Sequence, residues 1–343
     1  MRKTVILLLA LCLLCAAVPA LAEEPVRVRV SEVTHSVFYA PQYAAMALGF
    51  FADEGLEIDL MNGGGADKVM TAVVSGGADK VMTSVLTGEV DIGLAGPEAC
   101  IYVLLEGRKD APRVFAQLTQ CDGSFIVGRQ AEDFTWQNLR GKTILGGRKG
   151  GMPEMTLEYV MRKNGVIPHE DATVDTSVQF NMMAGAFVGG EADYVALFEP
   201  TATEVELAGQ GVVLCSIGEQ SGEIPYTAYF AAQSYLTENA DTVLRFTRAI
   251  ARGQEWVYAH TDRELAEAIV GYFPDTSVEV LEKVAARYKG IRAWKETPDM
   301  KQEALERLET VMEQAGELSQ RVAYEALVEN EFAYHVMAEM GQK

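Results

Sequence analysis

The chain has 343 residues, 49% of them apolar, and its 49 acidic side chains outnumber 29 basic ones to give a formal net charge of −20. This acidity argues against nucleic acid and anionic membrane surfaces as partners. The length and apolar content allow one or two substantial hydrophobic cores, and we expect two lobes.

A short apolar segment opens the chain. Arg2 and Lys3 precede an apolar run over residues 5–17, and a small residue, Ala22, closes the segment. The run is shorter than the roughly 20 residues that span a bilayer, but its layout is that of a secretory signal peptide. We therefore predict a cleaved signal peptide over residues 1–22 and an exported protein, periplasmic or associated with the cell surface. Cleavage removes two basic residues and no acidic one, so the formal charge becomes −22.

The cysteines do not form a disulfide framework. Cys15 lies inside the predicted signal peptide, and Leu14 stands where a lipid-attachment site requires a small residue, so the sequence leaves lipid anchoring open. Cys100, Cys121 and Cys215 follow in the mature chain. Three cysteines allow at most one disulfide bridge, and we expect buried free thiols.

The first part of the mature chain alternates strand and helix patterns. Valines alternate with arginines over residues 26–30, which predicts a strand with one buried face. Pro41 then opens a helical stretch that ends at Gly49, and Ile58 and Leu60 alternate with acidic residues in a second strand. Strand, helix and strand in this order indicate an α/β fold.

The alternation of strand and helix patterns returns later in the chain. We predict strands over 143–146 and 193–197 and helices over 154–163 and 201–210. From about residue 240 the pattern is almost entirely helical, and we expect the helical segment from Met300 onward to pack on the first lobe.

Two similar segments occur 102 residues apart. Residues 88–92 and 190–194 each place a Gly-Glu turn before a strand, and the loop after each strand carries a proline and a carboxylate, Glu98 or Glu199. In open α/β sheets, ligands bind outside the carboxyl ends of the strands. Two lobes that each offer such a loop would enclose a ligand, although a chance match of a short turn motif is the alternative.

Four stretches carry a family resemblance: SVFYAPQYAAMALGFFADEGLEIDL (36–60), TGEVDIGLAGPEA (87–99), GGRKGGMPEMTLEY (146–159) and FEPTA (198–202). Together they resemble the solute-binding proteins of ABC transporters that serve nitrate, taurine, sulfonates and thiamine pyrimidine precursors. The resemblance spans essentially the whole mature chain. It implies a two-lobed periplasmic-binding-protein fold of type II with two crossovers and a helical C-terminal segment.

The crossovers fix the expected domain boundaries. Gly, Ser, Asp and Pro cluster over 120–124 and 218–225, as hinges and turns require. We therefore assign residues 23–121 and 225–343 to a discontinuous first lobe and residues 122–224 to the second.

Aromatic residues and carboxylates are the first candidates for ligand contact. Phe38 and Tyr39 follow the first predicted strand, where their rings could stack on a planar ligand or could simply belong to the core. Glu98, which follows Gly96, and Glu199 could accept hydrogen bonds from an amine or aminopyrimidine. Helix capping or a solvated rim is the alternative for both carboxylates.

A glycine-rich link and a tyrosine are further candidates. Arg148, Gly150 and the backbone amides around them could hold an anion such as a sulfonate, or the link could be a plain connection from strand to helix. Tyr226 follows the second crossover, where its hydroxyl could reach the cleft. The sequence favours a pyrimidine-like solute slightly over a sulfonate or nitrate.

One segment departs from the family pattern. Residues 64–71 recur as residues 76–83, a tandem duplication with a 12-residue period. One uninterrupted helix through both copies would rotate its buried face by about 120°. We expect one copy to form an extra surface turn, and a neutral duplication in a surface segment explains it best. Which copy lines the cleft stays open.

These residues predict a binding protein, not an enzyme. The four histidines show no metal-ligand spacing, no catalytic constellation can be assembled, and we expect neither metal nor cofactor. The predicted function is capture of a small solute for an ABC permease and its ATPase, by a monomer. A ligand-sensing module for a membrane receptor is the alternative, followed by an enzyme that has a binding-protein fold.

Overall fold

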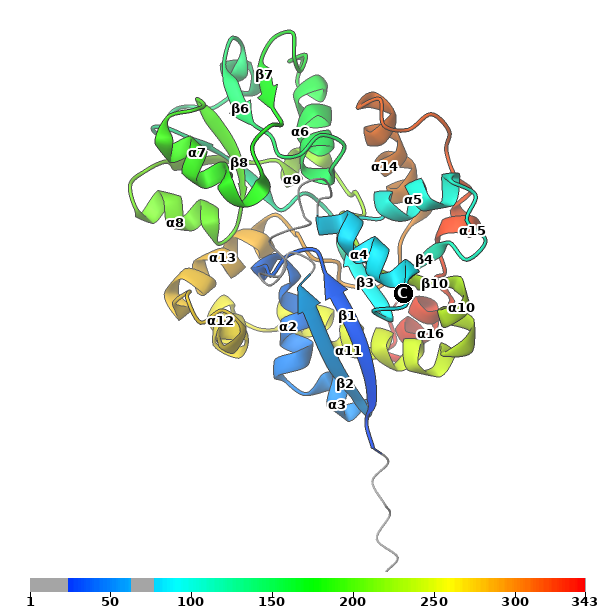
Figure 1. Ribbon diagram of the computed structural model, residues 1–343. Helices are drawn as coiled ribbons and strands as arrows, with labels where there is room; N and C mark the ends of the chain where they lie inside the picture. Colours follow the sequence, from blue (N-terminus) through cyan, green and yellow to red (C-terminus); the bar gives the residue numbers. More distant parts are fainter. Residues whose placement is uncertain (1–23, 63–76, 343) are drawn as a thin grey trace, which may run out of the picture.

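Two lobes, each built around a five-stranded sheet, make up the molecule (Figure 1). The computed structural model describes residues 24–62 and 77–342. The predicted signal peptide and the first copy of the 12-residue repeat lie outside this part. The mixed α/β architecture, with two crossovers and a helical C-terminal region, is the type II periplasmic-binding-protein fold that the sequence predicted.

The first sheet has the strand order β2-β1-β3-β10-β4. Its first three strands are parallel, whereas β10 runs antiparallel to both neighbours. Alternating valines keep one face of β1 in the core, because successive side chains of a strand point to opposite faces. The strands are β1 (Val26–Glu32), β2 (Leu56–Asn62), β3 (Ile92–Ala95), β4 (Pro112–Thr119) and β10 (Thr227–Ala232).

The second sheet repeats this arrangement in the order β7-β6-β8-β5-β9. Again three strands are parallel, and the fourth, β5, is antiparallel to its neighbours β8 and β9. The two similar segments at 88–92 and 190–194 therefore lead into equivalent strands, β3 and β8. The strands are β5 (Ser124–Gly128), β6 (Thr143–Leu145), β7 (Thr173–Asp175), β8 (Tyr194–Phe198) and β9 (Val212–Ser216).

Helices cover both sheets. With the first sheet are η1 (Val37–Tyr39), α2 (Ala40–Ala47), α3 (Phe50–Asp53), α4 (Gly77–Leu86) and α5 (Glu98–Leu105). With the second are η2 (Trp136–Leu139), α6 (Met152–Lys163), η3 (Phe180–Met182), α7 (Met183–Gly189), α8 (Thr201–Leu207) and α9 (Gly218–Ser221). After β10 come α10 (Gln233–Glu238), α11 (Ala240–Ala259), α12 (Asp262–Ile269), η4 (Val270–Tyr272), α13 (Val278–Gly290), α14 (Gln302–Gln314), α15 (Tyr324–Leu327) and α16 (Glu331–Glu339).

The C-terminal helices contact both lobes. The helix α11 packs on α2, and α16 packs on α11 and β4, as expected for a segment that belongs to the first lobe. In contrast, α14 lies against α6 of the second lobe (Figure 1). The expectation that everything after Met300 packs on the first lobe is therefore wrong for α14.

The two crossovers pack directly against each other. The chain leaves the first sheet at residues 120–123 and returns at residues 217–226. The Ile217 amide donates to the Ser124 carbonyl over 3.1 Å, and the Thr119 and Thr227 hydroxyls lie 2.6 Å apart. At Gly218 an added Cβ atom would clash with the Asp122 carbonyl oxygen, so only glycine permits this approach.

Cys100, Cys121 and Cys215 are free thiols, and the first two are buried. In the residues that the structure describes, no helix is both long and apolar enough to cross a membrane.

Gly218→Ala should destabilise the protein because the new methyl group forces the crossovers apart. We expect the free energy of unfolding to fall by about 1–3 kcal/mol, the usual cost of overpacking, in urea titrations followed by circular dichroism. Gly185→Ala, in α7, is the matched control, because an added Cβ atom there meets nothing within 4 Å. An equal effect of both substitutions would contradict the close packing.

Candidate functional site

An aromatic cluster lies where the two lobes meet. The Phe38 ring, on η1, is 2% exposed and contacts Phe198 at the end of β8, with ring centroids 5.5 Å apart. It also contacts Tyr226 of the second crossover at 5.7 Å and Tyr288 of α13 at 5.3 Å. Groups from both lobes and from a crossover therefore meet at one side chain.

Local contacts hold Phe38 in this position. The Ser36 hydroxyl caps η1 by accepting a hydrogen bond from the Phe38 amide over 3.2 Å. The Trp294 indole donates to the Phe38 carbonyl over 2.9 Å. A Cβ atom at Gly123, in the first crossover, would come within 2.5 Å of the ring. A glycine in the hinge is thus required for the aromatic contact.

Tyr39, after β1, and Glu98, after β3, are brought together. Glu98 opens α5 and is 5% exposed, and Tyr39 is 3% exposed. Burial raises the pKa of Tyr39 far above its ordinary range, and the charges of Glu32 and Glu98 add to the effect. An added Cβ atom at Gly96 would clash with the Glu98 carboxylate, so Gly96 makes room for it.

Asp122, within the predicted first crossover, is a buried acid that the sequence did not single out. Its side chain is fully buried, and its Oδ1 accepts hydrogen bonds from the Ser124 amide, over 2.6 Å, and from the Ser124 hydroxyl. The Tyr226 hydroxyl lies beside this carboxyl. Neither that hydroxyl nor Asp122 Oδ2 makes a hydrogen bond of good geometry to the described residues. Burial raises the pKa of Asp122 to about 6.

Glu199 faces an arginine across the lobes. Its Oε2 accepts from the Thr203 amide over 2.9 Å, and its Oε1 lies 2.7 Å from Nη1 of Arg287, on α13. Nη2 of Arg287 also pairs with Glu206 of α8 at 2.6 Å, as does the Lys283 amine at 2.6 Å. We call Glu199, Glu206, Lys283 and Arg287 the inter-lobe ion-pair cluster. A ligand that bound Glu199 would compete with these partners, so ligand contact at Glu199 stays a prediction.

The glycine-rich link after β6 lies opposite the first lobe. Gly150 has a φ of +72°, its amide donates to Glu154 over 3.1 Å, and its carbonyl accepts from the Tyr102 hydroxyl of α5 over 3.5 Å. A Cβ atom at Gly150 would lie 3.3 Å from the Glu317 carboxylate. The amide that was predicted to hold an anion is thus already used by a carboxylate. Contact of Arg148 and Gly150 with a ligand stays a prediction.

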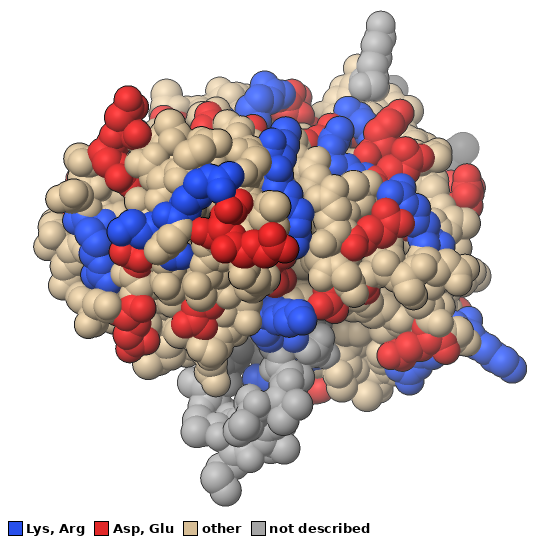
Figure 2. Space-filling view, turned by 90° about the horizontal axis from the view of Figure 1, so that it is seen from above, with Lys and Arg blue, Asp and Glu red and all other residues tan. Residues whose placement is uncertain are grey.

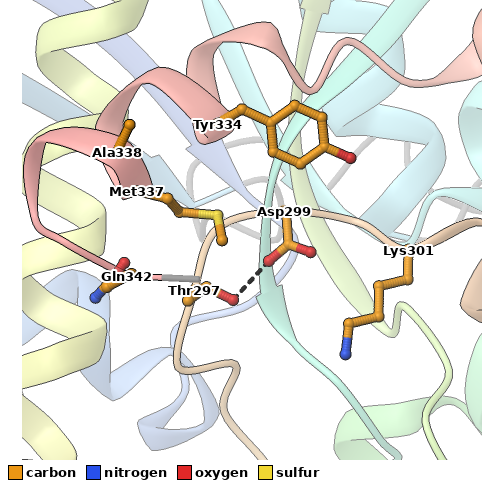
Figure 3. Close-up of a pocket in the computed structure, with 7 residues that line it drawn as sticks. All are labelled: Thr297, Asp299, Lys301, Tyr334, Met337, Ala338 and Gln342. Atoms are coloured by element: carbon orange, nitrogen blue, oxygen red, sulfur yellow. Dashed lines mark hydrogen bonds between the residues drawn. The ribbon is translucent and has the colours of Figure 1, made fainter.

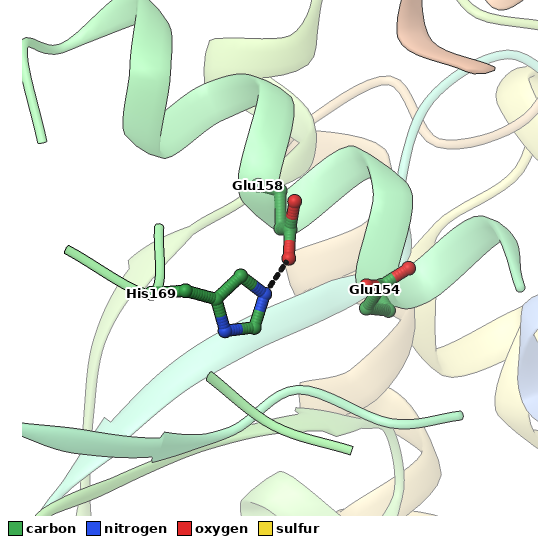
Figure 4. Close-up of side chains that lie close together, drawn as sticks. All are labelled: Glu154, Glu158 and His169. Atoms are coloured by element: carbon green, nitrogen blue, oxygen red, sulfur yellow. Dashed lines mark hydrogen bonds and ion pairs between the residues drawn. The ribbon is translucent and has the colours of Figure 1, made fainter. Parts of the chain in front are cut away.

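One group of side chains has the composition of a metal site (Figure 4). Ligand atoms of Glu154, Glu158 and His169 lie within 4.8 Å of one another. Glu158 is already bonded, however, to Arg162 at 2.8 Å and to His169 at 2.6 Å. Burial and the Glu158 charge raise the pKa of Glu154 to about 7, so a proton can take the place of a cation there. We interpret the group as a hydrogen-bond and ion-pair network around Glu158.

A separate hollow of about 450 Å³ lies on the first lobe (Figure 3). Its lining is Thr297, Asp299, Lys301, Tyr334, Met337, Ala338 and Gln342. None of these residues belongs to the groups that meet between the lobes, and the Asp299 carboxylate already accepts from the Thr297 hydroxyl.

Acidic and basic side chains alternate on the face seen in Figure 2, without a continuous basic patch. This face offers no extended surface for a nucleic-acid backbone.

Comparisons with known proteins agree with this fold. The family model described as NMT1/THI5 like matches residues 37–264. A protein of Bacillus subtilis (strain 168), named "Putative binding protein YtlA", is 43% identical over 314 residues, which cover 91% of this chain and 90% of that protein.

Solved structures share the fold. The alkanesulfonate-binding protein SsuA of Xanthomonas axonopodis pv. citri superimposes with a TM-score of 0.66 at 16% identity, over 90% of this chain and 99% of that one. The nitrate-binding protein NrtA of Synechocystis PCC 6803 gives 0.68 at 14% identity, over 92% and 89%. The desulfurization enzyme DSZB gives 0.61 at 13% identity, over 92% and 99%, so the fold also occurs in an enzyme.

Arg287→Met should loosen the lobes, because it leaves the buried Glu199 carboxylate without its cation. Removing one partner of a buried ion pair destabilises a protein by about 3–5 kcal/mol. Opening the lobes would expose the Glu199 carboxylate to water and relieve this destabilisation. We expect a larger radius of gyration in small-angle X-ray scattering of the ligand-free protein. The control is Arg263→Met, whose exposed ion pairs join α12 to α13 within one lobe. If both variants scatter like the wild type, the cluster does not hold the lobes.

Asp122 should make stability depend on pH. Burial raises the pKa of Asp122 from 3.8 to about 6, so the folded protein favours the protonated carboxyl. This stabilisation of the fold is complete below about pH 4 and is lost as the pH rises through about 6. Asp122→Asn, which keeps an acceptor for Ser124, should therefore match the wild type near pH 4. At pH 8 it should be more stable, by up to about 3 kcal/mol. Urea unfolding at both pH values measures this, and a variant less stable at pH 8 would contradict it.

Proposed function

The chain belongs to the NMT1/THI5-like family, and on that premise we propose that it is the extracytoplasmic solute-binding protein of an ABC-type importer. In this role it captures a small organic solute between its lobes and delivers it to a permease with an associated ATPase. The observation that carries the proposal is the meeting of both lobes and a crossover around Phe38. The predicted signal peptide agrees with export.

Lobe closure is the proposed mechanism. A ligand shifts the balance between open and closed forms only by its difference in affinity for the two, so groups from both lobes must touch it. Tyr39 and Glu98 come from the first lobe and Phe198 from the second. The inter-lobe ion-pair cluster adds an attraction that is present only when the lobes are close together. Closure marks the loaded protein for the permease.

The proposed solute is a nitrogenous, partly aromatic molecule of the thiamine-pyrimidine-precursor type. Buried carboxyls at Glu98 and Asp122 favour a ligand that donates hydrogen bonds, and the rings around Phe38 favour a flat one. A sulfonate or nitrate is the second candidate, because SsuA and NrtA share the fold. The Gly150 amide, which would hold such an anion, is bonded to Glu154.

Two other roles fit the same fold. A sensor module would present the closed form to a membrane receptor, and an enzyme would turn its solute over, as the name of the DSZB neighbour illustrates. Co-purification with a permease favours the importer over the sensor. Conversion of the solute during prolonged incubation with the purified protein would favour the enzyme.

A thermal-shift screen tests the proposed function. The purified mature protein is heated with pyrimidine precursors, small amines, taurine, alkanesulfonates or nitrate. A solute at 100 times its dissociation constant stabilises the fold by about 2.7 kcal/mol, which moves the melting point by several degrees. A shift that is confined to one chemical class supports the proposal and identifies the solute.

Glu98→Gln serves as the site variant in the same screen. It preserves side-chain volume and removes the charge, and we expect at least tenfold weaker binding of a nitrogenous solute. Absence of any shift with the wild-type protein would overturn the binding role for these solute classes.

A further inference from the structure

We propose that Asp122 and Tyr226 form a subsite, at the hinge, that binds a positively charged nitrogen of the solute. This inference rests on the proposed function, and it adds a recognition residue, Asp122, that neither the sequence pattern nor the comparisons identify.

Incompletely hydrogen-bonded polar atoms mark the subsite. Asp122 is 0% and Tyr226 4% exposed, and the Tyr226 hydroxyl lies close to the Asp122 carboxyl. Among the described residues, neither this hydroxyl nor Asp122 Oδ2 has a hydrogen bond of good geometry. Both Ser124 donors are used by Oδ1. Burying a polar group without a partner costs free energy, and native proteins rarely accept this cost. A donor on the solute would satisfy both atoms.

The surroundings of the pair favour a cation. Tyr226 lies close enough to Asp122 and Glu98 that their charges, after burial itself, raise its pKa well above the ordinary range. Two basic residues flank Tyr288 on the neighbouring helix α13, and both are committed: Arg287 to Glu199 and Glu206, and Lys289 to Asp262. A positively charged nitrogen between Asp122 and Tyr226 would therefore meet acidic partners whose charge is not neutralised by Arg287 or Lys289.

Aromatic rings add to this preference. Phe38 stands edge-on to the Tyr226 ring at 5.7 Å, and Phe198 lies 6.0 Å from the same ring. The faces of aromatic rings attract cations, and the attraction is stronger where water is excluded. The matching solute carries an ammonium or protonated ring nitrogen next to a flat, apolar body.

The position of the pair couples binding to closure. Asp122 lies in the first crossover and Tyr226 in the second, and the two segments touch at Gly218. A cation held by both residues ties the crossovers together. Such a ligand would interact better with one hinge geometry than with another, which is what a shift between open and closed forms requires.

Asp122 is a group at this subsite that changes charge near neutral pH. The titratable groups that face it are Tyr226 from the second crossover, Tyr288 from α13 and the adjacent Cys121, and burial raises the pKa of each of these three. The Glu98 carboxyl of α5 acts on Tyr226 as well. The pKa of Asp122 itself is about 6. A permanently charged solute should therefore bind more tightly as the pH rises through about 6, because Asp122 then carries its negative charge.

The test uses three probes with the same ring and different charge: benzylammonium, benzyl alcohol and benzenesulfonate. Isothermal titration calorimetry at pH 8 should show wild-type protein binding benzylammonium at least tenfold more tightly than either other probe. The Asp122→Asn variant should bind benzylammonium at least tenfold more weakly than the wild type. The Tyr226→Phe variant should bind it about threefold to tenfold more weakly. Lowering the pH to 5 should weaken binding by the wild type and leave Asp122→Asn unchanged.

Thr156→Val is the matched control, because Thr156 is equally buried in α6 and its hydroxyl also has no hydrogen-bond partner among the described residues. Its affinity for benzylammonium should equal that of the wild type. Circular dichroism and thermal unfolding confirm that each variant is folded.

The proposal is overturned if wild-type protein binds benzylammonium no more tightly than benzyl alcohol, or if Asp122→Asn binds it as tightly as the wild type. A failure here does not by itself remove the binding role. If taurine or nitrate still shifts the melting point in the wider screen, the solute-binding function stands without this subsite. If no solute in either experiment binds, both proposals fail.

Discussion

The site depends on the close packing of the two crossovers. Because Gly218 lies against the Asp122 backbone, the strands that enter and leave the second lobe form one compact joint. Gly123 in that joint admits the Phe38 ring, and Tyr226 is placed beside the Asp122 carboxyl. The packing of the crossovers therefore determines the aromatic cluster, the buried acid and the relative position of the lobes.

Much of the fold could be predicted because local patterns determine it. Alternating residues predicted β1 and β2, and the proline-opened helix is α2, within one or two residues of the observed ends. The similar segments at 88–92 and 190–194 predicted paired strands, and β3 and β8 hold equivalent places in the two sheets. Glu98 and Glu199 follow these strands, so their neighbourhoods were predictable although their partners were not.

What the sequence did not reveal are contacts between residues that only tertiary structure brings together. Arg287 lies on a helix far from Glu199 in the chain, and no spacing rule links them. His169 approaches Glu158 for the same reason. Asp122 lies in a turn whose sequence gives no signal of its role. The raised pKa of its carboxyl arises from complete burial, which depends on how the lobes pack. Such effects require the three-dimensional arrangement to be known.

The strand order also constrains how the protein is made. The antiparallel strand β10 fits between β3 and β4, so the first sheet has a gap until the ribosome has released residues beyond 232. All strands of the second sheet lie within residues 124–216 and can pair before that point. Synthesis from the N-terminus thus leaves the first lobe incomplete for most of translation. The lobe whose first strand is made first is therefore the one whose sheet is completed last.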